Sequence, residues 1–450
     1  METPICDFVR DYCARDALRL HMPGHKGRAL LGMEPLDITE FDGADELYAA
    51  AGIIRQSEEN AARLFGAART LYSAGGSPGG PRAGRSPALP PAGERGLRPA
   101  VAAGRNAHKV FLTAAALTGL EVDWLYPESP ESLLACGVEP ATLESYLDTR
   151  ERPAAVYVTS PDYLGNLADI RALSAVCRRR GVLLLVDNAH GAYLHFLPEP
   201  RHPLDLGADI CCDSAHKTLP ALTGAAYLHF SESAPAALIE QAENALAVFA
   251  STSPSYLILQ SLDAVNRVLA GDYRARLSET AQRTDALKAR LKSHGFALRG
   301  HERTKLTLAP KSFGYTGDAL AARLREADIL FEFHDPDYLV AMFTPSTAPE
   351  DFGRLERALC AVERRPPILT APPLPGRPAR ASAPRSAMLS PIELLPVENC
   401  LGRVLASANV GCPPAIPIVA CGERIDKNAL RCFRYYGIET CFVVKEPPEK

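Results

Sequence analysis

Two side chains that could act on one ligand follow two apolar segments of the chain. Asp187 comes directly after the run Val182–Val186, and Lys217 closes the stretch Asp-Ser-Ala-His-Lys that follows Ile210–Cys212. Both runs are typical of buried strands. In open α/β sheets, ligands bind just outside the carboxyl ends of the strands. We therefore expect the carboxylate of Asp187 and the amine of Lys217, about thirty residues apart in the chain, to face the same site.

A lysine and a carboxylate in this arrangement are what chemistry on pyridoxal phosphate (PLP) requires. The lysine forms an imine with the cofactor aldehyde, and the carboxylate keeps the pyridine nitrogen protonated, so that the ring accepts electrons from the substrate. Ser214 and His216 could donate hydrogen bonds to the cofactor phosphate. The simpler alternative is that Asp187 caps a turn and Lys217 is a solvated surface lysine. The two strand ends and the polar residues around them favour the cofactor site.

Two weaker signals precede this pair in the chain. The segment SAGGS, which contains Gly75, Gly76 and Ser77, follows a short apolar run. Glycines let backbone N–H groups approach a phosphate, and a following helix N-terminus would favour its negative charge. The segment RNAHK contains His108, which could stack on the pyridine ring. Taken alone, the first is a common turn, and the second is more simply an asparagine that caps a helix beside a surface histidine.

The elements that must position these residues alternate between short apolar strands and helices. Apolar residues at helical spacing predict a helix at Ile53–Phe65, which ends at Gly66, and a crossover helix at Ile170–Arg180. Long helices are expected at Leu257–Leu269 and Leu277–Leu291. The expected strands are Thr70–Ser73, Val122–Tyr126, Ala154–Thr159, Val182–Val186, Asp209–Cys212 and Ala225–Phe230. Continuous apolar strands separated by helices predict an α/β fold with a mostly parallel sheet that is covered on both faces.

The same pattern predicts five parts along the 450 residues. They are an N-terminal arm at 1–60, a large ligand-binding domain at 61–262, a small α/β domain at 263–365, a proline-rich linker at 366–387 and a small C-terminal domain at 388–450. One segment of the large domain is out of character, because Pro78–Pro99 holds six prolines and five glycines. Proline costs roughly 3 kcal/mol in a helix interior, so we expect this segment to be irregular and exposed.

Composition and charge exclude several classes of protein. Apolar residues make up 47% and charged residues 23%, which is ordinary for a globular protein with a sizeable core. The formal net charge of −4 gives no reason to expect nucleic acid or an anionic membrane as a partner. The N-terminus lacks the pattern of a signal peptide, and no apolar stretch could span a bilayer. The twelve cysteines form no CxxC pair, so we expect reduced thiols in a cytoplasmic protein and no structural metal.

Several motifs, in their order along the chain, resemble those of the ornithine/lysine/arginine decarboxylases. They are HMPGHKG at His21–Gly27, DITEFDGADEL at Asp37–Leu47, YSAGGS, GRNAHK, VDNAHGAY, DSAHKTL, STSPSY at Ser251–Tyr256 and CPPAIPIVACGE at Cys412–Glu423. This bacterial group acts on basic amino acids and has the aspartate-aminotransferase fold. The resemblance spans nearly the whole chain and is to the short members, which lack an additional receiver-like domain. It implies a seven-stranded PLP-transferase large domain, a small α/β domain and a small C-terminal domain.

The resemblance also implies a role for each candidate residue. Lys217 would carry the imine, Asp187 would pair with the pyridine nitrogen, and His108 would stack on the cofactor ring. The other candidates would line the cofactor: Ala189 on the opposite ring face, Ser214 and His216 beside the cofactor, and Gly75, Gly76 and Ser77 at its phosphate. Ser251–Tyr256 resembles a segment that approaches the site across a dimer interface, which implies a homodimer or a higher homo-oligomer. No role follows for His21–Gly27.

The chain departs from the family pattern at two places. The family has Ser-Thr or Ser-Ser in the phosphate-binding turn and then an amphipathic helix, whereas Ser77 is followed by Pro78 and the segment rich in proline and glycine. Either a local shift of the reading frame or an altered loop accounts for this difference. In the C-terminal motif, Gly411-Cys412 and Ala415 replace the more usual tyrosine and glycine.

The activity implied by the resemblance is PLP-dependent decarboxylation of a basic L-amino acid to the amine and CO2. Two alternatives stay open. The lysine and aspartate serve other PLP reactions of this fold, such as transamination or aldol cleavage, and the changed turn after Ser77 is compatible with an inactive dimer that acts as a binding or scaffold protein. The sequence does not distinguish lysine, ornithine and arginine as substrates. Glu332 is a candidate partner for the distal cation of the substrate, among many other acidic residues.

Overall fold

The chain forms two compact units, each of which is described by itself. The computed structural model describes residues 1–15, 17–76, 100–128, 132–135, 137–408, 411–412 and 416–446. The first unit comprises Met1–Pro91 and Ile170–Ser278, and the second comprises Ala92–Asp169 and Glu279–Lys450. Ser77 and the predicted irregular segment Pro78–Pro99 lie outside the described residues. The predicted five-part domain division stays a prediction.

A seven-stranded sheet has the strand order β1-β7-β6-β5-β4-β2-β3. The first unit contains β1 (Arg69–Ser73), β5 (Leu183–Asp187), β6 (Ile210–Asp213) and β7 (Ala226–Phe230), and the second contains β2 (Ala100–Gly104), β3 (Glu121–Leu125) and β4 (Ala155–Thr159). The pairs β5/β6, β2/β3 and β2/β4 are parallel, whereas β7 is antiparallel to β1 and to β6. The predicted α/β fold with a mostly parallel sheet is confirmed. The sequence pattern did not predict β2.

Strands β5 and β6 bring the two candidate residues to one edge of the sheet. Their sequences, LLLVD and ICCD, are almost entirely buried, as expected of strands that are covered on both faces. Helix α6 (Ile170–Arg180) precedes β5 and has the predicted bounds. The register pairs Leu185 with Ile210 and Asp187 with Cys212. Because the two strands are parallel, Asp187 and the segment that leads to Lys217 leave the sheet at the same edge.

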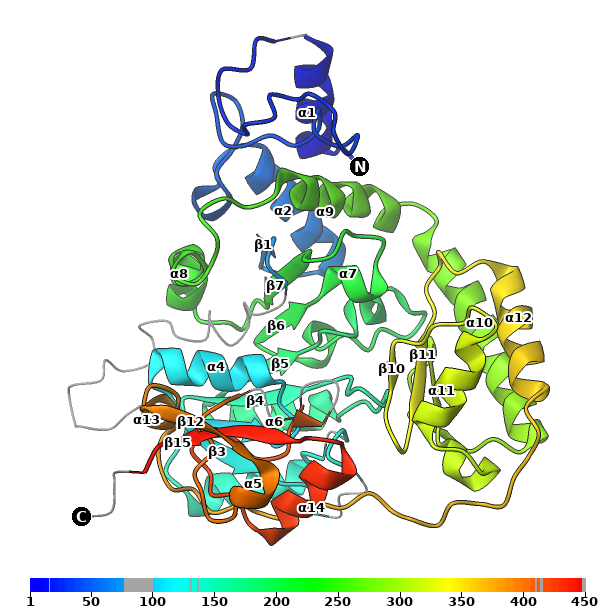
Figure 1. The fold of residues 1–450 in the computed structure, drawn as a ribbon. Coiled ribbons are helices and arrows are strands. Elements are labelled where there is room, and N and C mark those ends of the chain that lie inside the picture. Colours follow the sequence, from blue (N-terminus) through cyan, green and yellow to red (C-terminus); the bar gives the residue numbers. More distant parts are fainter. Residues whose placement is uncertain are drawn as a thin grey trace. The chain divides into compact units, whose positions relative to one another are not determined.

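Helices α2 (Ile53–Phe65) and α9 (Tyr256–Leu269) lie side by side in the first unit (Figure 1). The carboxylate of Asp45 accepts the N–H groups at the start of α2, and Gly66 in the left-handed conformation, with φ 62°, ends the helix. Asp263 on α9 is buried and accepts the hydroxyl of Ser57 on α2 at 2.6 Å. The first unit also contains the helices α7 (Ala215–Thr218) and α8 (Ala236–Ala247).

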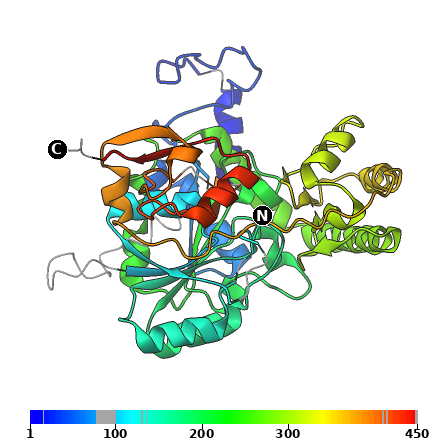
Figure 2. The ribbon, with the colours of Figure 1, turned by 60° about the horizontal axis from the view of Figure 1, so that its bottom comes forward.

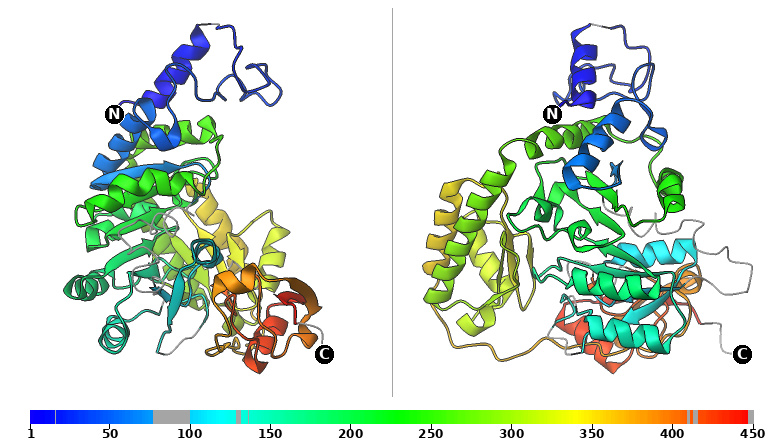
Figure 3. Two further views of the ribbon diagram at one scale, coloured as in Figure 1. Left: turned by 90° about the vertical axis from the view of Figure 1, so that its left-hand side faces the viewer. Right: turned by 180° about the vertical axis from the view of Figure 1, so that it is seen from behind.

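The N-terminal residues 1–60, predicted as an arm, contain regular structure that packs on the first unit. Helix α1 (Pro4–Ala14) contacts both α2 and α9, and the N–H of Cys6 donates to Asp263 at 2.9 Å. Residues 17–46 follow α1 without any helix or strand (Figure 3). The sequence pattern missed α1 because only three of its eleven residues are buried, which gives a short apolar stripe.

The second unit contains a four-stranded antiparallel sheet that packs against helices (Figure 1). Its elements are β8 (Leu298–Arg299), β9 (Lys305–Leu308), β10 (Phe333–His334) and β11 (Leu339–Met342), with α11 (Gly317–Arg325) and α12 (Pro349–Cys360). Helix α10 (Tyr273–His294) begins in the first unit and continues into the second at Glu279. The helices and the sheet share one apolar core, to which Leu291, Leu324 and Leu355 contribute from the helices and Leu306 from β9. This part corresponds to the small α/β structure expected from the sequence.

The C-terminal residues of the second unit form a separate antiparallel pair, β12 (Ile392–Pro396) with β15 (Thr440–Val444), beside α14 (Lys427–Tyr435) (Figure 2). Phe433 from α14 and Val443 from β15 are both fully buried in one core. The remaining elements of this unit are α4 (Lys109–Thr118), α5 (Pro140–Thr149), α13 (Pro384–Met388), β13 (Gly411–Cys412) and β14 (Ile416–Pro417). None of the helices in the described ranges has the length and apolarity needed to cross a membrane.

A buried carboxylate in the turn between β10 and β11 makes the stability of the second unit depend on pH. Asp335 Oδ1 accepts the N–H groups of Asp337 and Tyr338 at 2.7 and 2.6 Å, whereas its Oδ2 has no hydrogen-bond partner among the described residues. Burial, with a smaller effect of the nearby Asp337, raises the pKa of Asp335 to about 7. The folded state therefore favours the neutral acid.

The sign of this effect follows from linkage. An acid whose pKa is raised by folding contributes its full stability below its ordinary pKa, near 4, and that contribution is lost as the pH rises through about 7. The side chain of the Asp335→Asn variant is neutral at every pH. The melting temperature of the variant minus that of the unchanged protein should therefore be about 2–4 °C larger at pH 8 than at pH 5. Thermal unfolding followed by circular dichroism measures this difference. Parallel pH profiles for the two proteins would show that Asp335 does not titrate on unfolding.

Candidate active site

Lys217 lies on the short helix α7, which begins directly after β6. The backbone N–H of Lys217 donates to the carbonyl of Ser214 at 3.0 Å, which fixes the turn that leads from the strand into the helix. The Lys217 Nζ lies 3.1 Å from Nε2 of His190, a buried residue that follows β5. The structure therefore pairs the candidate lysine with an imidazole that can accept a proton from it.

Asp187 is the last residue of β5, and its side chain is 7% exposed. Its Oδ1 accepts the N–H of Ala189 at 3.2 Å and lies 3.7 Å from the thiol of Cys212. Ala189, the residue expected at one ring face, is half-buried. A carboxylate at a strand end beside a small side chain could hold a positive charge on a flat ligand.

The turn between Asp187 and His190 is held by backbone hydrogen bonds, one within the turn and one to β6. The N–H of Asn188 donates to the carbonyl of Cys212 at 2.9 Å, and the N–H of Gly191 donates to the carbonyl of Asn188 at 2.8 Å. A Cβ at Gly191 would lie 2.0 Å from Asn188 Oδ1, so this position requires glycine. The local sequence Asn-Ala-His-Gly thus returns the chain sharply and places His190 beside Lys217.

Ser214 and His216 lie on either side of the start of α7. Ser214 is buried, whereas His216 is partly exposed and its Nδ1–H donates to the carbonyl of Ala225 at 2.9 Å. This bond leaves Nε2 of His216 as the ring atom that can reach a ligand. Among the described residues, both side chains belong to the same segment as Lys217, but their predicted contact with a phosphate stays a prediction.

Gly75 and Gly76, predicted to bind a phosphate, follow β1 in the same unit. Among the described residues, a Cβ at Gly75 would meet nothing within 4 Å. The N–H of Gly76, which has φ +83°, donates instead to the carbonyl of Gly224 at 2.7 Å. The predicted phosphate contact of Gly76 would require this bond to break. The third predicted residue of this turn, Ser77, lies outside the described residues.

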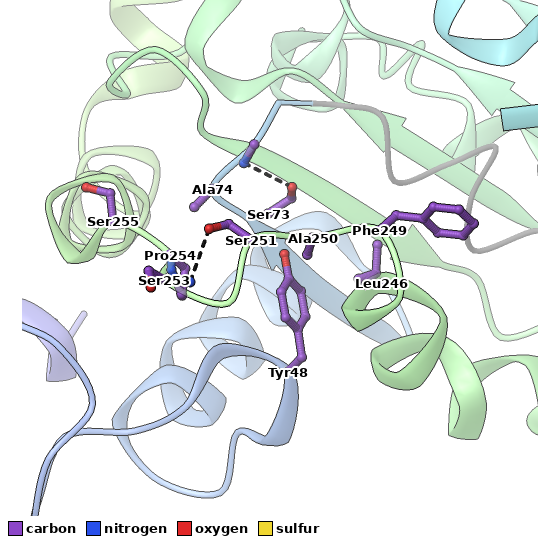
Figure 4. A pocket seen from close by; sticks show the side chains of 11 residues that line it. Tyr48, Ser73, Ala74, Leu246, Phe249, Ala250, Ser251, Ser253, Pro254 and Ser255 are labelled. Carbon is purple, nitrogen blue, oxygen red and sulfur yellow. Dashed lines mark hydrogen bonds between the residues drawn. The ribbon is translucent and has the colours of Figure 1, made fainter. Parts of the chain in front are cut away.

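A pocket of about 370 Å³ opens beside this turn, and hydroxyl groups line much of it. Ser73 and Gly75 belong to the turn, Tyr48 comes from the N-terminal residues, and Ser251 and Ser255 come from the predicted interface segment (Figure 4). The N–H of Ser253 donates to Ser251 Oγ at 3.1 Å, which orders that segment. The structure thus brings two of the predicted motifs, SAGGS and STSPSY, to one pocket of the first unit.

His108 belongs to the second unit, where it caps helix α4. Its extended backbone precedes the helix, and its Nδ1 accepts the N–H of Val110 at 3.3 Å. The simpler expectation placed an asparagine at this cap, but Asn106 is buried two residues earlier and the histidine is the cap. The ring is partly exposed, and its predicted stacking on a cofactor stays a prediction.

One group of three potential metal ligands occurs in the described ranges, formed by His202, Cys211 and Asp213 in the first unit. These side chains are fully buried, and Asp213 Oδ2 lies 2.9 Å from His202 Nε2. The ten cysteines whose side chains are described are all free thiols. The pKa of the Cys211 thiol is raised well above its ordinary value, mainly by burial.

The residues described around Lys217 fit PLP at the ring and at the lysine. They provide an amine with a proton acceptor at 3.1 Å, a buried carboxylate at a strand end and a small residue, Ala189, whose N–H donates to that carboxylate. The hydroxyls beside Gly75 suit a phosphate, although part of that region lies outside the described residues. Sequence reasoning quoted the motif that contains His190 but gave that residue no role. The signal was its position three residues after the candidate carboxylate, in a turn that ends in an obligatory glycine.

Comparison with known families gives two matches. Residues 3–307 match the family described as "Orn/Lys/Arg decarboxylase, major domain", and residues 376–447 match "Orn/Lys/Arg decarboxylase, C-terminal domain". An arginine decarboxylase of Bacillus subtilis is 30% identical over 460 residues, which cover 95% of this chain and 92% of that protein. An arginine decarboxylase of Halalkalibacterium halodurans is 28% identical, covering 96% of this chain and 93% of that protein.

Solved structures of similar fold include two lysine decarboxylases. Lysine decarboxylase A from Pseudomonas aeruginosa has a TM-score of 0.80 at 17% identity and covers 98% of this chain and 80% of its own. The lysine decarboxylase LdcF of Francisella novicida has a TM-score of 0.78 at 16% identity, covering 98% of this chain and 81% of its own. At these identities the likeness concerns the fold.

Proposed function

The chain belongs to the Orn/Lys/Arg decarboxylase family, and on that premise we propose that it binds PLP at Lys217 and releases CO2 from a basic L-amino acid. The observation that carries the proposal is the contact of 3.1 Å between Lys217 Nζ and His190 Nε2, beside Asp187 at the ends of two neighbouring strands. When bound, PLP supplies an aldehyde that captures amines and a ring that accepts the electrons left behind by CO2.

Lys217 and His190 handle protons in this proposal. An ammonium group is no nucleophile, so Lys217 Nζ must lose a proton before it attacks a carbonyl carbon. His190 Nε2 is at hydrogen-bond distance and can accept that proton. After CO2 leaves, a proton must be delivered to the substrate Cα, and the same pair is the candidate donor. The burial of His190 keeps bulk water away from this exchange.

Asp187 has an electrostatic role. Its carboxylate is nearly buried, and its Oδ1 accepts the N–H of Ala189 at 3.2 Å and lies 3.7 Å from the thiol of Cys212. An oxygen of this carboxylate would hold a proton on the ring nitrogen of the cofactor, which strengthens the ring as an electron acceptor. Ser214, His216 and the turn at Gly75 are proposed to hold the phosphate, and His108 is proposed to stack on the ring.

Arginine is the first substrate to test, because curated relatives with 27–30% identity are named arginine decarboxylases. The experiment is to purify the full chain with PLP and to record its visible absorbance, followed by CO2 release with L-arginine, L-lysine and L-ornithine. We expect a yellow protein that releases CO2 from at least one of the three. A yellow protein that transaminates or cleaves carbon–carbon bonds without CO2 release would favour another PLP reaction. A colourless protein would favour a binding or scaffold role.

We also propose that the protein is a homodimer. In the irregular residues 17–46, Leu18, Leu20, Leu30 and Leu31 are each at least 80% exposed. Four exposed leucines in one irregular segment favour a surface that a partner covers, and symmetric dimers are the commonest assembly. A second copy of the chain would cover these leucines.

The double variant Leu30→Asp/Leu31→Asp should weaken this dimer at least about tenfold, because burial of a leucine contributes roughly 1.5–3 kcal/mol. Sedimentation at micromolar concentrations measures the change. Leu369→Asp is the matched control, since Leu369 is 89% exposed in the segment after α12 and far along the chain from the proposed interface. An unchanged protein that is monomeric and active at these concentrations would contradict the proposal.

A further inference from the structure

A buried anion in the first unit contacts the turn that carries two of the candidate site residues. Asp213 ends β6, four residues before Lys217, and its side chain has no exposed surface. Its Oδ1 accepts a hydrogen bond from Asn188 Nδ2 at 2.7 Å, and its Oδ2 accepts one from His202 Nε2 at 2.9 Å. His229 Nε2 lies 3.4 Å from the same Oδ2. No step of the proposed reaction uses these groups.

The histidines beside Asp213 are neutral. His202 Nδ1 accepts the N–H of Leu204 at 3.3 Å, so it carries no proton, and its Nε2–H is the donor to Asp213. Burial, although opposed by Asp213, lowers the pKa of His229. Burial alone would raise the pKa of Asp213, but its contacts with His202 and His229 outweigh burial and lower that pKa well below its ordinary value. The cluster therefore holds one negative charge, which belongs to Asp213.

The same tautomer argues against a metal ion at His202, Cys211 and Asp213. A metal ligand needs the lone pair of the ring nitrogen that faces the ion. His202 would have to bind through Nε2, which carries the proton donated to Asp213, while Nδ1 already accepts from Leu204. The raised pKa of Cys211, to which burial contributes first and Asp213 second, keeps its thiol protonated as well. A hydrogen-bonded anion accounts for all of these contacts.

Asn188 connects this anion to the site. It is the residue between Asp187 and Ala189, and it is fully buried. Its backbone N–H donates to the carbonyl of Cys212, its side chain donates to Asp213, and its Oδ1 fills the space that a side chain at position 191 would need. The turn that carries Asp187 and His190 is thus joined to β6 by one backbone bond and one charge-assisted side-chain bond. Bonds of the second kind are roughly twice as strong as neutral ones.

We propose that Asp213 is a positioning residue, whose buried charge holds the Asn188 turn against β6 and so sets Asp187 and His190 in register with Lys217. The proposal rests on the proposed function for its consequence in catalysis, but its structural part concerns the turn alone. Displacements of about 1 Å in an active site lower rates by as much as about 100-fold. A looser turn would move the carboxylate and the imidazole relative to the amine without removing either group.

The test compares Asp213→Asn with the unchanged full chain. An asparagine has one acceptor and one donor at the positions where Asp213 has two acceptors, and both neighbours donate. At least one of the two hydrogen bonds that Asp213 accepts, from Asn188 or from His202, must therefore break. Hydrogen exchange of the backbone amides at 188–191 should become at least about tenfold faster. In the PLP-loaded protein, the visible circular dichroism of the cofactor should change and kcat should fall on the order of 30- to 100-fold, with KM within about threefold.

Asn188→Ala is the second variant. If Asp213→Asn does not fold, this variant tests whether the bond between Asn188 and Asp213 holds the turn. It removes only the bond from the turn to the anion and leaves His202 on Asp213, so it should reproduce the faster exchange and the loss in kcat. The matched control is Asp263→Asn. Asp263 is also a fully buried aspartate of the first unit, with its two oxygens accepting from Ser57 and from the N–H of Cys6. Its loss should lower the melting temperature while kcat and exchange at 188–191 stay within about twofold.

Three results would overturn the proposal. Unchanged exchange at 188–191 in both Asn188→Ala and Asp213→Asn would show that the charge does not hold the turn. An equal loss of kcat in Asp263→Asn at matched stability would show a general effect of destabilisation. One equivalent of zinc in the purified protein, lost in Cys211→Ser, would make the cluster a metal site. If the exchange changes as expected but the unchanged protein takes up no PLP, the proposal that Asp213 holds the Asn188 turn is supported and the proposed function fails.

Discussion

Lys217→Ala should remove both the visible absorbance of the PLP-loaded protein and its turnover. The variant keeps Asp187 and His190 but has no amine at the start of α7, where Lys217 Nζ lies 3.1 Å from His190 Nε2. No imine to the protein can then form. We expect kcat to fall on the order of 10,000-fold or more, as when the nucleophile of other enzymes is removed. Absorbance spectra and CO2 release measure the two effects. Borohydride reduction followed by mass spectrometry of peptides identifies the modified lysine.

The controls for this prediction are two other lysines of the family-like motifs, Lys26 and Lys109. Lys26 lies in the irregular residues 17–46 of the first unit, and its Nζ donates to the carbonyl of His21. Lys109 is the first residue of α4 in the second unit. Replacing either with alanine should leave the absorbance in place. A reducible adduct at Lys26 or Lys109 in the Lys217→Ala variant would move the imine to another residue and end the present assignment.

The strands around the site could be predicted because continuous apolar composition indicates a strand that is buried on both faces. The runs that became β5 and β6 are apolar on both faces, and each ends where a charged residue enters, at Asp187 and Asp213. Helix α6 was predicted within its observed bounds because apolar residues recur at helical spacing between two such strands. The site edge followed from these ends and from the rule that parallel strands place their carboxyl ends together.

Strand β2 escaped prediction for an equally physical reason. Its sequence, AVAAG, is made mainly of small residues and has no run of β-branched or aromatic side chains. Such a segment becomes a strand because neighbours pair with it on both sides, here β3 and β4, and not through its own propensity. The helix α1 was missed because it packs only a few residues against α2 and α9.

Contacts between distant residues set the chemistry of the site and could not be predicted from the motifs alone. His190 meets Lys217 across 27 positions in the chain, and the partners of Asp213 come from three separate segments. In the turn predicted to bind a phosphate, the N–H of Gly76 donates to the carbonyl of Gly224, a contact that the motif did not indicate. A motif gives residue types and their order, but the register of neighbouring strands decides which of them touch.

Asp187→Ala should leave some PLP bound and yet lower turnover by about 100- to 1,000-fold, the loss expected when one preorganised electrostatic partner is removed. The carboxylate at the end of β5 is 7% exposed and is the group proposed to hold the proton on the ring nitrogen. Without it, that proton would be lost near neutral pH, and the ring would accept electrons less readily. CO2 release under saturating PLP measures kcat, and the visible spectrum reports how much cofactor remains.

Asp209→Asn is the matched control for Asp187→Ala, because Asp209 is a carboxylate on the same pair of strands at their opposite ends. It precedes β6, and its Oδ2 accepts the N–H of Leu184 at 2.8 Å, just inside β5. Its replacement should cost some stability and leave kcat within about twofold. If Asp187→Ala and Asp209→Asn lower kcat alike, the effect of Asp187 is one of folding. Near-normal decarboxylation by Asp187→Ala would remove the electrostatic role proposed for this carboxylate at the end of β5.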